Sequence, residues 1–380
     1  MASLHAGPGA AFSRLHELAQ ADVEQGVVPS RSQASSNHWI LWQEFCDDLQ
    51  LDSTLVSYDD PVPILQVFAY LFRNGFINAS GRKVRARTVE DIVRSIGQAF
   101  AAVGARDPRL NSLGKMDFRL NRMWKAYKKQ DPPPNRVKPI PVPILQRILA
   151  VALLSASVAA IAVADMICLA FFFLLRPGEY TGTTATSTPF RLCDVELRTG
   201  AIRHNVLTTP IPTLRAATFV TLTFTTQKNG VEGEVMGLAR SGSPTFCPVQ
   251  CTIRRIIHLR QHGAPATTPL ASYYDSNNKL CHVTSHAISS ALKLAVQVMG
   301  VPYGFLPKDI SARSLRAAGA MALLCAQVDS DIIRLLGRWR SDEMLRYLHV
   351  QAEPVMRNFS SQMLQHGTFT LLPNQEVPMF

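Results

Sequence analysis

The stretch from Leu335 to His349, LLGRWRSDEMLRYLH, places a tyrosine where a short helix can present its hydroxyl as a nucleophile. Residues 331–336 have the apolar spacing of a helix, and Gly337 is typical of a helix C-terminus. The acidic residues after Ser341 then predict a new helix start, so that Tyr347 lies ten residues after Gly337. A tyrosine held in this way can form a covalent intermediate with its substrate.

Two arginine motifs precede this stretch. In FFFLLRPGEY, residues 171–180, Glu179 follows Arg176 by three positions. In SARSLRAAGAMA, residues 311–322, Arg316 comes before a run of small residues that predicts a closely packed helix. A guanidinium group stays charged and can donate two hydrogen bonds to phosphate oxygens, which makes phosphate the natural ligand of such a pair.

A hairpin is predicted between the two arginine motifs. Residues 219–224, FVTLTF, alternate like a strand, and residues 226–230, TQKNG, have turn composition. Residues 234–238 would form the returning strand. Lys228 therefore lies at the predicted hairpin tip.

Taken in order, four residues resemble the catalytic set of the tyrosine recombinases, also called the phage-integrase family: Arg176, Lys228, Arg316 and Tyr347. The resemblance covers roughly residues 140–365. The sequences of the motifs, LLRPGEY and LGRWRSDEMLRYLH, look most like those of the recombinases of crypton and DIRS-type mobile elements. The resemblance implies a mainly α fold with a small antiparallel β-sheet, formed by a helical N-terminal core-binding domain and a mixed α/β catalytic domain.

Two positions depart from the family pattern. Arg313 occupies the position that is histidine in the second family motif, and an arginine cannot relay a proton as histidine does. The third motif has histidine or tryptophan directly after the glycine, whereas here Arg338 follows Gly337 and Trp339 comes one residue later. Two alternatives to an active recombinase therefore stay open: a catalytically inactive DNA-binding relic and a type IB topoisomerase-like enzyme.

The resemblance implies a division of labour in phosphodiester cleavage. Arg176 and Arg316 would meet the charge of the pentacoordinate phosphate, with Glu179 holding Arg176 in place. Lys228 would protonate the leaving 5′ oxygen, since neighbouring cations lower the pKa of a lysine. Tyr347 would form a 3′-phosphotyrosine that conserves the bond energy. Such a reaction needs no metal and no cofactor.

Composition favours an anionic partner. The 380 residues have a net charge of +11 and a pI near 9.5. We expect double-stranded DNA as the partner, a homotetramer on DNA by resemblance, and no small-molecule substrate. The odd number of cysteines, seven, and an N-terminus without a secretory pattern favour an intracellular protein, nuclear if the source is eukaryotic.

A small helical domain is predicted over residues 31–131, after an N-terminal tail of residues 1–30. Its fourth helix, residues 118–129, has an apolar face and a basic face, and a second basic run covers residues 82–87. In the family, a domain at this place grips the duplex. The predicted DNA contacts are Arg82, Lys83, Arg85, Arg87, Arg119, Arg122, Lys125, Lys128 and Lys129.

A proline-rich linker, residues 132–142, leads to the predicted catalytic domain, residues 143–366, and a tail, residues 367–380. The apolar stretch 151–175 is long enough to raise the alternative of a membrane span. Asp165 near its middle instead favours two buried helices, about 142–153 and 158–174, and we expect no membrane association.

The cysteine and histidine spacing does not favour a zinc site. Cys247 and Cys251 are followed by His258 and His262, but the gap between the two pairs is too short for a C2H2 finger. We therefore predict no metal ligands.

Overall fold

The computed structural model describes residues 13–16, 18, 19, 22, 26, 29–133, 137–182, 189–225 and 233–339. The chain divides into two compact units, Met1–Pro134 and Asn135–Phe380. It is mainly helical with a small antiparallel sheet, which confirms the predicted fold class.

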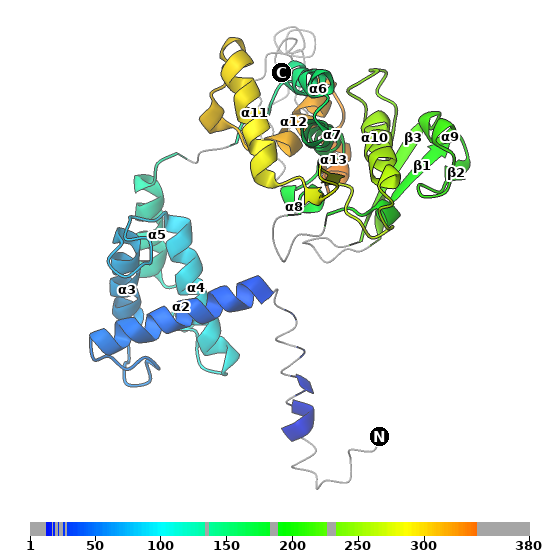
Figure 1. Cartoon of the computed structure of the whole chain (residues 1–380). Helices are drawn as coiled ribbons and strands as arrows, with labels where there is room; N and C mark the ends of the chain where they lie inside the picture. Colours follow the sequence, from blue (N-terminus) through cyan, green and yellow to red (C-terminus); the bar gives the residue numbers. More distant parts are fainter. Residues whose placement is uncertain are drawn as a thin grey trace, which may run out of the picture. The chain divides into compact units, whose positions relative to one another are not determined.

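The N-terminal unit contains four long helices around one apolar core (Figure 1). They are α2 (Pro29–Asp48), α3 (Val62–Asn74), α4 (Ala86–Ala102) and α5 (Phe118–Gln130). Trp42, Phe68 and Leu120 are fully buried at the centre of this core. On α5, Asp117 accepts a hydrogen bond from the Arg119 amide and caps the helix.

A buried arginine closes this unit at its C-terminal end. The Arg73 guanidinium on α3 donates to a carboxylate oxygen of Asp131 at 3.0 Å and to the Tyr127 carbonyl at 3.2 Å. The other Asp131 oxygen accepts from the Ala86 amide at 2.8 Å, at the start of α4. The pairing ties three helices together just before the proline-rich segment, because a buried cation is stable only when its donors are satisfied.

In the part of the C-terminal unit that the structure describes, the α-helices are α6 (Val142–Ser155), α7 (Val158–Phe172), α8 (Pro177–Tyr180), α9 (Ile211–Arg215), α10 (Pro248–Gln261), α11 (Ser285–Met299), α12 (Ser314–Cys325) and α13 (Ser330–Leu336). Helix α7 runs through the middle of the unit and packs against α6, α10, α11 and α12 (Figure 1). Residues 162 and 164–171 of α7 are buried, which explains their apolar composition.

The apolar stretch 151–175 therefore belongs to two core helices. Ala156, in the left-handed conformation at φ 51°, separates them, and the Ser157 hydroxyl caps α7. Asp165 is fully buried and accepts from Arg254 Nε at 3.0 Å. Among the described helices, none has both the length and the apolar character that a membrane crossing requires.

A four-stranded antiparallel sheet lies on the side of α10 that faces away from α7 (Figure 1). Its strands are β1 (Val195–Thr199), β2 (Ile202–His204), β3 (Phe219–Phe224) and β4 (Glu234–Ala239), in the order β2-β1-β3-β4. A separate two-stranded ribbon is formed by β5 (Ser272–Tyr274) and β6 (Leu280–His282). The predicted hairpin is β3–β4, with Phe224 paired to Glu234 at its base.

Helix α12 approaches α7 closely because Gly319 has no side chain. A Cβ at this position would overlap the Phe171 carbonyl oxygen and the Leu174 side chain. The small residues after Arg316 thus allow two helices to touch and fix the first turn of α12, which carries Arg316, against the C-terminal end of α7.

Candidate active site

Arg176 follows the sharp exit of the chain from α7, where Leu174 has a φ of 51°. Its amide donates to Glu179 Oε2 at 2.7 Å, and its Nη1 donates to Glu179 Oε1 at 2.9 Å. The expected contact between the two side chains is present. It fixes the guanidinium relative to α8 and leaves Arg176 partly exposed, at 26% of its side-chain surface.

Arg316 projects from the first turn of α12 and is 4% exposed. Its Nη2 donates to the Gly337 carbonyl, and its guanidinium carbon lies 4.2 Å from the centre of the Trp339 ring. A cation over an indole face is attracted by the ring quadrupole. Trp339 therefore packs against the charged end of Arg316.

The two arginine motifs meet at the turn after α13. Arg176 Nη2 donates to the Arg338 carbonyl at 3.4 Å, next to the Gly337 carbonyl that Arg316 contacts. Residues from three distant parts of the sequence thus form one cluster, which we call the arginine cluster: Arg176, Glu179, Arg316, Arg338 and Trp339.

The turn itself differs from the expected glycine cap. Gly337 has an ordinary φ of −79°, and Arg338 adopts the left-handed conformation, with a φ of 55°. Glycine is required at 337 for space, since a Cβ there would overlap the Trp339 ring. The sequence suggested a conformational reason for this glycine, whereas the structure shows a packing reason.

Arg338 is also buried in the arginine cluster, with 2% of its side chain exposed. Its Nη2 donates to Glu179 Oε2 at 2.9 Å, and its guanidinium carbon lies 3.8 Å from the centre of the Phe224 ring. Burial lowers the pKa of Arg338, and the Glu179 charge opposes that shift. Three guanidinium groups and one carboxylate give the described part of the cluster a net charge of +2.

The remaining predicted site residues fall into two groups. Arg313 is exposed and immediately precedes α12, and no contact found among the described residues joins its side chain to the arginine cluster. A further cation beside Glu179, after Arg176, is Arg338, and the role of Arg313 stays a prediction. Lys228 and Tyr347 lie outside the described residues, so their positions stay predictions.

The nine predicted DNA contacts are all exposed on the N-terminal unit, but their surroundings differ. Arg119 binds both Asp60 and Asp117, which raise its pKa. Arg87 and Lys128 have carboxylate partners as well, Asp91 and Glu90. A hollow of about 590 Å³ on α5 is lined in part by Phe118, Arg122, Lys125 and Lys129.

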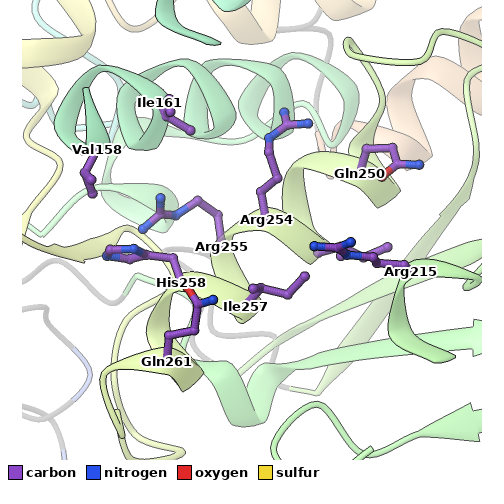
Figure 2. Close-up of a pocket in the computed structure, with 10 residues that line it drawn as sticks. Val158, Ile161, Arg215, Gln250, Arg254, Arg255, Ile257, His258 and Gln261 are labelled. Carbon is purple, nitrogen blue, oxygen red and sulfur yellow. The ribbon is translucent and has the colours of Figure 1, made fainter. Parts of the chain in front are cut away.

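A second hollow, of about 550 Å³, lies against α10 (Figure 2), and none of its lining residues belongs to the arginine cluster. Two of its arginines are already satisfied by the protein. Arg254 extends from α10 toward α7, where it pairs with Asp165, and Arg255 donates to the Ser272 carbonyl (Figure 2). Both guanidinium groups therefore stabilise the packing of α10 against its neighbours.

The cysteines and histidines considered for zinc have other partners. The Cys251 thiol accepts from Arg254 at 3.0 Å, and His258 Nε2 accepts from the Tyr274 amide at 2.9 Å. Within the described ranges, no group of three or more His, Cys, Asp or Glu side chains is placed to hold a metal ion. All seven cysteines are free thiols.

No family model and no curated protein matches the sequence. Among solved structures, the chain is similar to those of tyrosine recombinases, and it has their fold. The integrase of transposon Tn1549, in complex with circular intermediate DNA, superimposes with a TM-score of 0.51 at 14% identity, over 91% of this chain and 97% of that one. The XerA recombinase superimposes with a TM-score of 0.36 at 11% identity, over 92% of this chain and 96% of that one. The fold assignment rests on the first.

Proposed function

We propose that this protein is a site-specific DNA recombinase or integrase of the tyrosine type, which cuts and rejoins duplex DNA through a 3′-phosphotyrosine. The observation that carries the proposal is the meeting of Arg176 and Arg316 at residues 337 and 338. These arginines come from motifs about 140 residues apart, so contacts of both with the same turn are not expected by chance. The fold shared with the Tn1549 integrase, which was solved with DNA, supports the same conclusion.

The arginine cluster suits a phosphodiester because its charge is fixed before the substrate arrives. Arg176 keeps an exposed edge, while Glu179 and the 338 carbonyl limit its rotation. Arg316 is held by stacking and by the 337 carbonyl. Donors that need no reorganisation stabilise the charge that develops on the phosphoryl oxygens in the transition state.

In the proposed reaction, the Tyr347 oxygen attacks the scissile phosphorus and the bond to the 5′ oxygen breaks. Lys228 gives its proton to that oxygen, so a free 5′ hydroxyl and a 3′-phosphotyrosine result. Attack by a 5′ hydroxyl of the same or another duplex reverses the step. The phosphoester bond energy is retained throughout, and no cofactor enters the chemistry.

The N-terminal unit would hold the duplex through its exposed lysines and arginines. Among the described residues, carboxylates pair with Arg87, Arg119 and Lys128 but not with Arg82, Lys83, Arg122, Lys125 or Lys129. Each phosphate that the latter residues neutralise would release counterions. We further propose assembly as a tetramer on two duplexes, an origin in a crypton- or DIRS-like mobile element, and a nuclear location in a eukaryotic host.

A DNA-binding relic is the second candidate, and Arg313 favours it. The position expected to hold histidine carries an exposed arginine that cannot relay a proton. Loss of cleavage with retained DNA affinity would identify this outcome.

The test is covalent capture on DNA. The protein is incubated with a library of nicked, partly randomised duplexes, and adducts that resist SDS are isolated and sequenced. We expect adducts from the wild type and none from Tyr347→Phe, with both proteins binding the selected duplex equally in a mobility-shift assay. An adduct in the Tyr347→Phe protein would show that the nucleophile is another residue. Relaxation of supercoils by a monomer would identify a topoisomerase instead.

A further inference from the structure

Arg338 has a role that the proposed reaction leaves unassigned. Both terminal nitrogens of its guanidinium donate to protein acceptors, and only 2% of its side chain is exposed, so a DNA phosphate would have to displace those acceptors. A buried cation is costly unless charge and hydrogen bonds compensate it. The partners that compensate Arg338 therefore indicate what it does.

Those partners belong to three separate segments. Nη1 and Nη2 donate to the carbonyls of Phe173 and Leu174, at the exit from α7, at 3.3 and 3.4 Å. Nη2 also donates to Glu179 Oε2 at 2.9 Å. The guanidinium plane lies on the ring of Phe224, the last residue of β3. One side chain thus joins the Arg176 segment, the turn after α13 and the base of the β3–β4 hairpin.

Glu179 is shared between two cations in a defined way. Oε1 accepts from Arg176 Nη1, and Oε2 accepts from the Arg176 amide and from Arg338. With Arg338 present, both oxygens of the Glu179 carboxylate accept hydrogen bonds, and its negative charge is shared between Arg176 and Arg338. Without Arg338, Glu179 would remain nearly buried with one cation, and its tighter pairing would draw the Arg176 guanidinium away from a phosphate.

We infer that Arg338 is a positioning residue that holds Glu179, and through it Arg176, in the orientation in which Arg176 and Arg316 can bind one phosphate together. The inference rests on the proposed function. It gives Arg338 a task inside the protein, because its guanidinium already donates to the Phe173 and Leu174 carbonyls and to Glu179.

The ratio of the cleavage rates on a charged and a neutral substrate tests this role, because a simple loss of stability would slow both reactions equally. In a methylphosphonate, a neutral methyl group replaces one charged oxygen at the scissile phosphate, so the need for aligned arginines falls. We expect Arg338→Met to slow cleavage of the normal phosphodiester by about 30- to 100-fold, because a displacement of about 1 Å in a catalytic group has effects of this size. On the methylphosphonate, Arg338→Met should cleave at most about threefold more slowly than wild type, since the arginine pair stabilises less charge in that transition state.

Arg255→Met is the matched control, because Arg255 is equally buried in the same unit and donates to the carbonyls of Leu270 and Ser272. Any defect of this variant should be the same on both substrates. Arg338→Lys keeps the charge and should recover part of the rate. DNA affinity should stay within about twofold of wild type for Arg338→Met, because the lost charge makes no phosphate contact.

Each outcome decides the inference. It is overturned if folded Arg338→Met cleaves at the wild-type rate, if its defect is equal on both substrates, or if it loses DNA affinity but not the cleavage rate of bound DNA. If Arg338→Met does not fold, the double variant Glu179→Gln with Arg338→Met removes both charges and is tested on the same two substrates. A wild-type protein that forms no adduct would refute the proposed function itself, which is a distinct result.

Discussion

Arg176 and Arg316 donate hydrogen bonds to the carbonyl oxygens of two adjacent residues, 338 and 337, although they lie in motifs far apart in the sequence. A turn with one left-handed residue, Arg338, exposes both carbonyls toward the guanidinium groups. The turn after α13 therefore acts as a template that sets the distance between the two arginines. Arg316 gains a further constraint from the Trp339 ring on the same turn.

We predict that Trp339→Leu will slow cleavage while leaving DNA affinity unchanged. Leucine retains apolar packing against Leu174 and Ile333 but has no π face for Arg316. Since a cation–π contact is worth about 0.5–2 kcal/mol, the single-turnover rate of adduct formation should fall about 2- to 30-fold. Trp339→Phe keeps an aromatic face and should lose less. Equal rates for the Leu and Phe variants would show that the stacking has no part in catalysis.

We predict that Gly319→Ala will destabilise the C-terminal unit and misplace Arg316. The added methyl group would overlap the Phe171 carbonyl, which is backbone and cannot rotate away, so α12 must move from α7. Overpacking of this kind costs about 1–3 kcal/mol, measurable by urea denaturation.

Gly178→Ala is the control for that substitution. Gly178 lies in α8 beside Arg176, yet an added Cβ would meet no atom within 4 Å. The free energy of unfolding and the cleavage rate of this variant should match those of the wild type. A comparable loss in both variants would mean that the contact between α12 and α7 is not the cause.

The sequence was sufficient for the fold class and for the order of the arginine motifs, because helix periodicity and motif spacing are local properties. It also predicted that the apolar stretch near Asp165 is buried, although the partner of that carboxylate, Arg254, lies on another helix. No local pattern identifies such a partner.

The burial of Arg338 could not be predicted for the same reason. From the sequence, an arginine is expected at the surface, where Arg313 indeed lies. Arg338 is buried only because Glu179 and Phe224, from two other segments, supply charge and a ring face. The glycine at 337 likewise had a packing cause, the Trp339 ring, that a cap motif does not reveal.

We predict that His258 makes stability depend on pH in the acid range. Burial, with the Arg255 charge adding to it, lowers the pKa of His258 to about 4, and the neutral ring accepts from the Tyr274 amide. The unfolded chain binds a proton near pH 6.5 and the folded chain does not until about 4. The stability from this group is thus complete above pH 6.5 and is lost as the pH falls toward 4.

The measurement compares urea unfolding at pH 5 and pH 7. From pH 7 to pH 5, the free energy of unfolding of the wild type should fall by about 1–2 kcal/mol more than that of His258→Gln, allowing for partial solvent screening. His286→Gln, at an exposed position on α11, should behave as wild type. An identical pH response in His258→Gln and wild type would exclude His258 as the source.

We predict that the basic residues of α5 contribute unequally to DNA binding. Arg119 is already bound to Asp60 and Asp117, and a phosphate would have to displace those carboxylates. The Arg122 guanidinium lies 6.0 Å from the centre of the exposed Phe118 ring, and Lys125 and Lys129 line the same hollow. Replacing Arg122, Lys125 or Lys129 by alanine should therefore lower the slope of log K against log salt by about 1 each, as loss of one phosphate contact does. Arg119→Ala should leave that slope unchanged. A change in slope for Arg119→Ala as large as that for Arg122→Ala would mean that DNA does compete with the two aspartates for Arg119.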